Sequence, residues 1–537
     1  MAEPSVPSSL CFWQVPAHQA ALRPQAVALR FEGSALTYAE LAARSERMAA
    51  VLWHGWGVRA GERVAWLGLN HPEQLVLLFA LARIGAMLLP LNSRLAPAEW
   101  DTQLRDCQPA HLVHDEHWAA QARELGERCG VSVHDVQSLE VTAAGEPDAP
   151  TIGDAASPAL LVYTSGTTGR PRAAVHTQAN LLANMRIAAQ LQQITPGDTV
   201  LTVLPLFHVG GLCIQTLPGL YAGACVLLHS RFSADATLAA LAQDRPTLTL
   251  QVPATMQALI EHPQWPQIDL SCLRAVWAGS SVLPPALVRA FLDRGVPLCN
   301  VYGATETGPF SIALPPAAAH SHAGSCGWPA PGVKVMLAGV NAGIGELLVR
   351  GPNVVANYWP GQRACDEQGW FHSGDLATRA DDGSYTVAGR ARDLIISGGE
   401  NIHPLEIESA IGAHPAVAEC AAFGLPDAQW GESVAVALVL QPGAQLSQQA
   451  LRDHLAGRLA RFKLPRRVFF VATLPKTALG KLQRGALAQL ASEAELQEAG
   501  AGRAAGGSAR AGAIRDASQT SSSTGSPSKA VAVKKLT

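Results

Sequence analysis

The N-terminal part of the chain alternates between the hydrophobic patterns of strands and of helices. Apolar runs that predict strands lie at residues 26–31, 63–69 and 86–91. Thr37 and Glu40 form a capping box that opens a helix to about residue 53, and Pro72 opens a second helix to about residue 84. Strands that are joined by helices predict a parallel sheet covered by helices.

The same alternation continues further along the chain and then gives way to a different pattern. Four more strands are expected at residues 199–204, 248–252, 274–278 and 297–301. After about Arg390, helices at 404–413 and 448–459 flank strands at 417–424 and 433–440. Two helices with two adjacent strands indicate a small α+β unit.

We predict an α/β fold with a large N-terminal domain of parallel-type sheets covered by helices and a small mobile α+β C-terminal domain. The N-terminal domain is placed at residues 1–391 and the C-terminal domain at residues 392–498. Residues 499–537 are rich in Ala, Gly and Ser, end in basic residues and lack periodicity, which predicts a disordered tail. A chain of 537 residues is also long enough for more than one core.

Composition narrows the class of protein. Hydrophobic residues make up 48% of the chain and charged residues 15%, so the chain carries enough apolar surface to fold. The formal net charge of −3 provides no positive field, so no nucleic-acid partner is expected. The ten cysteines are scattered and form no CxxC pair, which favours free thiols in a reducing cytoplasm.

One uncharged stretch raises the question of a membrane segment. Residues 199–230 contain no Asp, Glu, Lys or Arg and are long enough to span a bilayer. Prolines and glycines such as Pro205 and Gly223 interrupt the stretch, so we expect a strand, a loop, a helix and a second strand that line a cavity. The N-terminus also lacks the pattern of a signal peptide. We therefore expect no integral membrane segment.

The strongest chemical signal is the segment YTSGTTGRPR at residues 163–172, which follows a predicted strand. Its two glycines allow tight turns that present backbone N–H groups, and its hydroxyl side chains add donors. Arg172 adds a permanent positive charge, so the segment suits a polyphosphate. The alternative is an ordinary Ser/Thr/Gly surface loop. The segment is neither a Walker A loop nor a GxGxxG turn.

Two acidic residues belong to further candidate segments. Glu306 lies in YGATETG, directly after a predicted strand, where a carboxylate can hold Mg²⁺ beside phosphates. Asp375 ends the segment GWFHSGD, where it can accept hydrogen bonds from a ribose diol. The alternatives are a helix N-cap formed by Thr305 and an aspartate in a turn at residue 375.

Two segments near the C-terminus complete the set. Residues 389–404 lie where the composition changes, so we expect a hinge there, and the alternative is a plain linker. Lys481 lies in PKTALGKLQR and is one of only seven lysines among 40 basic residues. A compact ammonium on a flexible stem suits a group that reaches into a site and withdraws. The alternative is a solvated basic face.

In this order the five segments resemble those of the adenylate-forming superfamily, which includes acyl-CoA synthetases, peptide-synthetase adenylation domains and luciferases. The resemblance runs from about residue 34 to about residue 487 and is closest to aryl-CoA and o-succinylbenzoate-type ligases. It implies an enzyme that joins a carboxylic acid to the α-phosphate of ATP and releases pyrophosphate. The acyl group then passes to coenzyme A, and AMP leaves. ATP, Mg²⁺ and coenzyme A are therefore implied.

The resemblance implies a nucleotide site built from the first three segments. Thr305 would contact the α-phosphate, and Glu306 would be the metal ligand for Mg²⁺. Residues implied to wrap the β- and γ-phosphates are Thr164, Ser165, Gly166, Thr167, Thr168, Gly169 and Arg172. Residues implied to hold the adenine and the ribose are Gly279, Ser280, Tyr302, Asp375 and Arg390.

The same resemblance implies a moving C-terminal domain. Lys481 would bridge the carboxylate and the α-phosphate during adenylation. Arg392 falls at the hinge position, where the family usually has Lys or Asp. Rotation about the hinge would remove Lys481 and bring up the thiol site. Residues implied to lie near coenzyme A are Trp430, Lys463 and Arg466.

The acyl site follows from the resemblance as well. His208 resembles the aromatic residue that gates this site in the family, and the alternative is a core histidine. The implied lining is uncharged and several of its residues are tiny: Val209, Gly210, Leu250, Val301, Gly303, Gly308 and Pro309. Such a lining favours a hydrophobic acyl group of fair size, from an aryl, alicyclic or medium-chain acid.

One departure from the family pattern lies in the first segment, where the usual Pro-Lys-Gly is Pro171-Arg172-Ala173. Arginine keeps the charge in a planar fork, so we expect activity to survive with at most an altered Michaelis constant for ATP. Two alternative functions are an acyl-AMP ligase that loads a carrier protein and a non-catalytic nucleotide-binding scaffold. The expected partners are a carboxylic acid, ATP and coenzyme A, and a homo-oligomer is left open.

Overall fold

The computed structural model describes residues 10–141, 148–164, 171–279, 283–397, 400–427, 431–456, 458–476, 482–489 and 491. The chain divides into two compact units. The first comprises Met1–Ser373 and Ala377–Val387, and the second comprises Gly374–Leu376 and Ala388–Thr537. The predicted tail at residues 499–537 lies outside the described residues.

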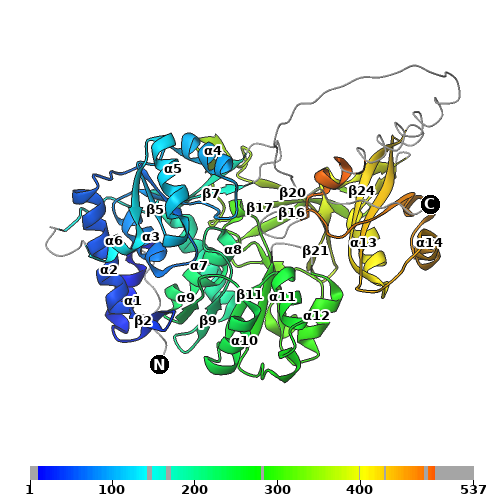
Figure 1. The fold of residues 1–537 in the computed structure, drawn as a ribbon, viewed down its shortest axis with the longest axis horizontal. Helices are drawn as coiled ribbons and strands as arrows, with labels where there is room; N and C mark the ends of the chain where they lie inside the picture. Colours follow the sequence, from blue (N-terminus) through cyan, green and yellow to red (C-terminus); the bar gives the residue numbers. More distant parts are fainter. Residues whose placement is uncertain are drawn as a thin grey trace, which may run out of the picture. The chain divides into compact units, whose positions relative to one another are not determined.

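A nine-stranded sheet runs through the first unit (Figure 1). In sheet order its strands are β15 (Trp328–Pro329), β14 (Ile312–Ala313), β13 (Leu298–Tyr302), β12 (Ala275–Gly279), β11 (Leu248–Gln251), β9 (Thr199–Thr202), β10 (Cys225–Leu228), β1 (Val27–Phe31) and β2 (Ser34–Thr37). The strands from β13 to β1 pair in parallel, and antiparallel pairs close both edges. The connecting helices are α10 (Ala234–Gln243), α11 (Pro253–Ile260) and α12 (Pro285–Leu292).

A second sheet of eight strands lies in the same unit. Its order is β19 (Gln362–Arg363), β18 (Asn357–Tyr358), β8 (Arg172–Thr177), β7 (Pro158–Thr164), β4 (Met87–Pro90), β3 (Arg63–Leu67), β5 (His111–His114) and β6 (Ser132–Asp135). The strands from β7 to β6 pair in parallel, whereas β8, β18 and β19 add antiparallel pairs. Parallel strands joined by helices confirm the predicted α/β class.

A four-stranded sheet and a set of helices complete the chain up to residue 390. The sheet has the order β16 (Lys334–Asn341), β17 (Ile344–Arg350), β20 (Phe371–Arg379) and β21 (Tyr385–Arg390). The helices are α1 (Val15–Leu22), α2 (Tyr38–Ala50), α3 (Pro72–Arg83), α4 (Pro97–Cys107), α5 (Ala119–Cys129), α6 (Val136–Val141), α7 (Gln178–Gln192), α8 (Val209–Gly211) and α9 (Leu217–Ala222).

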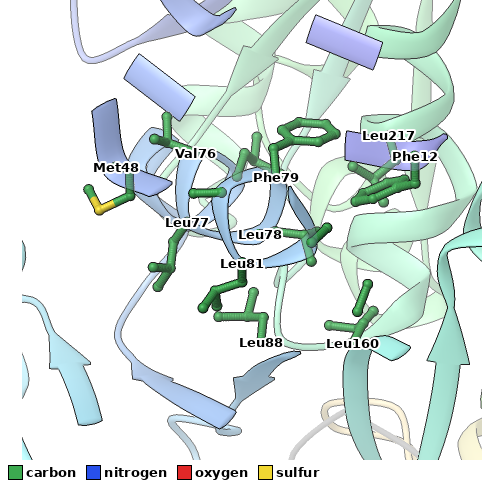
Figure 2. Close-up of a cluster of buried hydrophobic side chains, with 14 of the residues drawn as sticks. Phe12, Met48, Val76, Leu77, Leu78, Phe79, Leu81, Leu88, Leu160 and Leu217 are labelled. Carbon is green, nitrogen blue, oxygen red and sulfur yellow. The ribbon is translucent and has the colours of Figure 1, made fainter. Parts of the chain in front are cut away.

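The largest part of the core surrounds helix α3, which is buried on all sides (Figure 2). Leu77, Leu78 and Leu81 of this helix belong to the same apolar cluster as Leu88 of β4 and Leu160 of β7. A helix that is apolar all round has to be covered on every face, so α3 needs neighbours from several elements.

The predicted capping box is present, and the uncharged stretch has the predicted order of strand, loop, helix and strand. Thr37 accepts a hydrogen bond from the backbone of Glu40, and the carboxylate of Glu40 accepts one from the backbone of Thr37. The stretch at residues 199–230 forms β9, a loop, α8, a π-helical segment (Leu212–Thr216), α9 and β10. Within the described part of the chain, no helix is both long enough and apolar enough to cross a membrane.

Two predicted helix ends are wrong. α2 ends at Ala50, and the predicted last turn is instead the π-helical segment Val51–Gly55, because the amide of Trp56 bonds to the carbonyl of Val51. The helix expected at residues 448–459 ends at Leu455.

The second unit is built on a five-stranded sheet. Its elements are β22 (Ile395–Ser397), β23 (Glu400–Ile402), α13 (Pro404–Gly412), β24 (Val417–Asp427), β25 (Gly431–Leu440), α14 (Gln448–Leu455) and β26 (Arg467–Phe470). The β24–β25 pair is antiparallel and β26 pairs in parallel with β25. Ile407 and Ile411 of α13 and Leu451 and Leu455 of α14 pack in one apolar cluster with Val436 of β25. The small α+β unit predicted from the sequence is therefore present.

Arg484 holds distant segments of the second unit together. Its guanidinium donates two hydrogen bonds to the carboxylate of Glu408 at 2.7 and 2.8 Å and one to Asp393 at 3.2 Å. A further bond reaches the carbonyl of Ala422 at 3.1 Å. The side chains of Arg484, Asp393 and Glu408 are all largely buried, with exposures of 18%, 20% and 13%. Removing one partner of such a network leaves buried charges without compensation.

His176 is the next-to-last residue of β8 and is fully buried, with 0% exposure. Neither of its ring nitrogens has a hydrogen-bond partner among the described residues. Burial in this apolar setting disfavours the charged imidazolium and lowers the pKa of His176 from 6.5 to about 4.

We predict that His176 makes the protein sensitive to acid. Between pH 6.5 and about 4 the unfolded chain binds a proton that the folded chain excludes, so the free energy of unfolding falls as the pH falls through this window. The loss in the free energy of unfolding is on the order of 3 kcal/mol, because each pH unit between the two pKa values contributes about 1.36 kcal/mol. Urea unfolding of His176→Leu should therefore depend less on pH than that of the wild type. Equal pH dependence would contradict this role, and His320→Leu, at an exposed histidine, is the control.

We also predict that Arg484→Met destabilises the second unit by about 3 kcal/mol, the usual cost of breaking a buried ion pair. Methionine keeps much of the apolar stem but leaves Glu408 and Asp393 without a cation. Arg458→Met, at an exposed arginine, is the matched control and should change the unfolding free energy by less than about 0.5 kcal/mol. Identical denaturation curves for the two variants would rule out a stabilising role for the Arg484 network.

Candidate active site

Several predicted site residues follow adjacent parallel strands of the nine-stranded sheet. β12 and β13 pair in parallel with Gly279 opposite Val301, and β11 pairs with the other side of β12. Tyr302, which ends β13, is half-buried. The carboxyl ends of parallel strands lie at one edge of the sheet, which is where open α/β sheets bind ligands. The fold therefore brings Gly279 and Tyr302 to such an edge.

The glycine at residue 279 has a packing reason. A Cβ atom at this position would lie 2.9 Å from the carbonyl oxygen of Val301 and 3.0 Å from its Cγ1. Only glycine allows β12 and β13 to approach this closely without movement. Ser280, which was predicted beside the adenine, lies outside the described residues.

Glu306 lies in a short 3₁₀ turn, Thr305–Thr307, directly after β13. Ala304 is the N-cap of this turn, and its amide donates to Oγ1 of Thr307 at 2.9 Å. The alternative role of Thr305 as an N-cap is therefore wrong, because Thr305 is the first residue of the turn. Glu306 is buried, with 8% exposure, whereas Thr305 is half-buried.

The Gly-rich segment joins two adjacent strands. β7 ends at Thr164, β8 begins at Arg172, and these two residues are partners in the antiparallel register. Oγ1 of Thr164 donates to the carbonyl of Arg172 at 3.4 Å. The predicted phosphate-binding residues Ser165, Gly166, Thr167, Thr168 and Gly169 lie outside the described residues. The segment therefore begins and ends at one point of the sheet.

The departure at residues 172–173 is compatible with the backbone. Ala173 lies in β8 opposite Tyr163, in an extended conformation that any residue can adopt. The guanidinium carbon of Arg172 lies 4.2 Å from the centre of the Tyr358 ring. Nε of Arg172 is buried and has no hydrogen-bond partner among the described residues. The guanidinium of Arg172 thus places a positive charge at the C-terminal end of the Gly-rich segment.

Tyr358 connects this cation with Glu306. Its hydroxyl donates to Oε1 of Glu306 at 2.8 Å, and its ring lies beneath the guanidinium of Arg172. Burial, together with the negative charge of Glu306, raises the pKa of Tyr358 far above its ordinary value, so the hydroxyl keeps its proton and remains a donor. No motif in the sequence pointed to Tyr358. The signal available was the rarity of tyrosine, of which the chain has six.

The proposed gate and lining of the acyl site are partly explained by local packing. Nδ1 of half-buried His208 accepts a hydrogen bond from the amide of Gly210 at 3.0 Å and so caps α8. Leu250 and Val301 belong to one buried cluster, and Val209 belongs to another. A Cβ atom on Gly303 would collide with the carbonyl oxygen of Pro309.

Gly308 is a glycine for a backbone reason as well. Its φ of +89° lies in the left-handed region, and a Cβ atom there would stand 2.9 Å from the carbonyl oxygen of Asn353. The small size of Gly303 and Gly308 is thus set by the backbone. It is no evidence for a wide acyl site, which corrects that part of the reasoning from sequence.

The predicted ribose ligand lies in the second unit. Asp375 is buried, with 9% exposure, and lies within β20, so the alternative of an aspartate in a turn is wrong. Nε of Arg390 lies 2.9 Å from Oδ1 of Asp375. Arg392 is exposed in the 3₁₀ turn Ala391–Asp393, with its Nε 3.7 Å from Oδ1 of Asp393. Arg390 thus fixes the carboxylate that was predicted to hold the ribose.

The residues predicted near coenzyme A are described only in part. Nζ of Lys463 contacts both carboxylate oxygens of Glu406 at 2.6 and 2.7 Å, so this lysine already has an anionic partner. Arg466 is exposed just before β26. Trp430 and Lys481 lie outside the described residues.

Comparison with known proteins identifies the family. The model for the "AMP-binding enzyme" family matches residues 16–359, and the model for the "AMP-binding enzyme C-terminal domain" matches residues 406–481. The chain is 41% identical to indoleacetate–CoA ligase of Aromatoleum aromaticum over 500 residues, which cover 89% of this chain and 98% of that protein. It is 40% identical to feruloyl-CoA synthase of an Amycolatopsis species over 481 residues, with coverages of 88% and 97%.

Solved structures give the same result. o-Succinylbenzoate CoA synthetase from Bacillus subtilis, in complex with its acyl-adenylate intermediate, matches with a TM-score of 0.81 and 32% identity, over 90% of this chain and 98% of that one. The same protein in complex with ATP and a magnesium ion matches with a TM-score of 0.80 and 31% identity, over 89% and 99%. The chain therefore belongs to the AMP-binding enzyme family, which confirms the resemblance of its five segments to adenylate-forming enzymes.

Proposed function

We propose that the substrate of this enzyme is a hydrophobic aryl acid, which it activates with ATP and joins to coenzyme A. The reaction class follows from the family: the chain is an AMP-forming acyl-CoA synthetase that uses ATP, Mg²⁺ and coenzyme A. The choice of an aryl acid is supported by the relatives, because indoleacetate, ferulate and o-succinylbenzoate all carry an aromatic ring.

The buried carboxylate of Glu306, joined through Tyr358 to the cation of Arg172, is the observation that carries the proposed site. Tyr358 occupies Oε1, and Oε2 accepts no hydrogen bond from the part of the chain that the structure describes. Mg²⁺ prefers such hard carboxylate oxygens, so Glu306 fits the role of its ligand. When bound, Mg²⁺ neutralises charge on the phosphate oxygens of ATP.

The chain's own groups would position the rest of the nucleotide. Thr164 and Arg172 stand at the two ends of the Gly-rich segment, where a hydroxyl and a guanidinium can hold the β- and γ-phosphates. We assign the α-phosphate to Thr305 and the adenine to Tyr302 with Gly279. This chemistry needs positioning and charge neutralisation more than covalent assistance.

The second unit would supply the remaining groups. Asp375, oriented by Arg390, is proposed to accept hydrogen bonds from the ribose hydroxyls. Lys481 is proposed to bridge the acid and the α-phosphate during adenylation, with Arg392 at the hinge. A phosphate of coenzyme A would have to compete with Glu406 for Lys463, and Arg466 is the second proposed contact for that phosphate.

The compartment and the domain boundary are proposals as well. We place the enzyme in the cytoplasm, where its ten free thiols would stay reduced. Burial raises the pKa of the Cys107 and Cys299 thiols to about 12, which suppresses the reactive thiolate. We keep the domain boundary at residue 391, close to the point where the second compact unit resumes at Ala388.

The substrate class can be tested by mass spectrometry of the purified enzyme with ATP, Mg²⁺, coenzyme A and a panel of acids. We expect acyl-CoA and AMP with aryl acids, and at least tenfold less product with medium-chain and alicyclic acids of similar size. Preference for a non-aromatic acid would overturn the aryl proposal but leave the ligase intact. Acyl-AMP that never proceeds to acyl-CoA would favour a carrier-loading ligase, and ATP binding without turnover of any acid would favour a scaffold.

The role of Lys481 gives a sharper prediction. Lys481→Ala should lower acid-dependent exchange of pyrophosphate into ATP by at least about 100-fold, because an electrostatic contact to the transition state is lost, while ATP still binds. Lys476→Ala is the matched control: its ammonium is paired with Glu419, and the variant should keep the wild-type rate. Wild-type exchange by the Lys481 variant would show that this lysine takes no part in adenylation.

A further inference from the structure

We propose that Tyr358 is a positioning residue that joins Arg172 and Glu306 into one ATP–Mg²⁺ binding unit. Its hydroxyl would orient the carboxylate of Glu306 for the metal, and its ring would hold the guanidinium of Arg172 near the phosphates. The inference rests on the proposed function, because it takes Glu306 as the metal ligand and Arg172 as a phosphate ligand.

The backbone around Tyr358 is fixed to both partner segments. Tyr358 pairs with Ala174 in the antiparallel register of β18 and β8, and the amide of Trp359 donates to the carbonyl of Ala173 at 2.8 Å. On the other side, the amide of Val355 donates to the carbonyl of Glu306 at 2.8 Å. The segment from 355 to 359 is therefore bonded to β8 and to the 3₁₀ turn, which leaves the tyrosine little freedom to move.

The hydroxyl of Tyr358 acts on the carboxylate. The bond to Oε1 of Glu306 is 2.8 Å long, and both side chains are buried. A hydrogen bond to a charged acceptor in such surroundings is strong and directional, so it fixes the plane of the carboxylate. Residues that orient a metal ligand in this way change metal affinity by 10- to 100-fold when they are altered.

The ring of Tyr358 acts on the cation. At 4.2 Å from the ring centre, the guanidinium of Arg172 lies within the range of a cation–π contact. A planar guanidinium stacks on an aromatic face, while the ammonium of a lysine at this position would not be held flat against it. The buried Nε of Arg172 has no partner in the described ranges. The ring therefore keeps an arginine ordered where the family usually has a lysine.

A binding experiment distinguishes the role of the Tyr358 hydroxyl from the role of its ring. Affinity for α,β-methylene ATP, which cannot transfer its adenylyl group to an acid, is measured by calorimetry in excess Mg²⁺ and in EDTA. Tyr358→Phe keeps the ring and loses the hydroxyl, so it should weaken binding about tenfold in Mg²⁺ and leave binding in EDTA unchanged. Tyr358→Leu also removes the ring, so it should weaken binding in EDTA as well.

Two further variants keep the result interpretable. Tyr385 has the same 3% exposure as Tyr358, and its hydroxyl donates to the carbonyl of Val335 at 3.3 Å, so Tyr385→Phe controls for the loss of a buried hydroxyl and should bind like the wild type. In a Glu306→Gln background, Tyr358→Phe should cause no additional loss in Mg²⁺, because the hydroxyl acts through the carboxylate.

The outcomes are distinguishable. Equal affinity of Tyr358→Phe and the wild type in Mg²⁺, or an additive loss in the Glu306→Gln background, would overturn the positioning role of the hydroxyl. Thermal unfolding checks that each variant is folded, and the phenylalanine variant alone decides if Tyr358→Leu does not fold. Failure of the wild type to bind the analogue in either condition would instead overturn the proposed function.

Discussion

The buried carboxylate of Glu306 is the constraint on which the candidate site depends. A charge with 8% exposure is costly to bury unless it is hydrogen-bonded and faces a compensating charge. Tyr358 supplies the hydrogen bond, and the guanidinium of Arg172 covers the face of the same ring. β8, the turn after β13 and β18 must therefore meet, and the pairing of β18 with β8 brings two of them together. The antiparallel strands β8 and β18 of the eight-stranded sheet thus help to hold the buried carboxylate of Glu306.

Much of the fold could be predicted because its signals act over a few residues. The capping box of Thr37 and Glu40, the proline that opens α3 and the apolar runs of β3 and β9 all depend on local periodicity, and the structure contains each of them. The ends of elements were less predictable. α2 changes to a π-helical segment at Val51 because Trp56 bonds five residues back, and no local pattern distinguishes that bond from the usual one.

The sequence pointed to motif residues of the proposed site but not to their partners. Arg172 and Glu306 were proposed because hydroxyls, glycines and isolated charges stand out directly after apolar runs. Tyr358 lies 52 residues from Glu306 in the sequence, and the pairing of β18 with β8 and the bond from the amide of Val355 to the carbonyl of Glu306 bring it there. Gly303 was misinterpreted from the sequence. Its small size suggested room for a substrate, but a side chain at this position would collide with the carbonyl of Pro309. A glycine in a sequence does not reveal whether a ligand or the backbone occupies the space beside it.

At two places the structure holds an arginine in a fixed position, Arg172 on Tyr358 and Arg484 between Glu408 and Asp393. The planar fork of arginine suits stacking and paired carboxylates. A group that has to enter the site for one half-reaction and leave before the next gains nothing from such fixed contacts. Arg484 lies three positions after Lys481 and binds Asp393, next to the proposed hinge at Arg392. A rotation of the second unit would therefore move Arg484 and Asp393 together. Lys481 would keep the flexible stem that its proposed role requires.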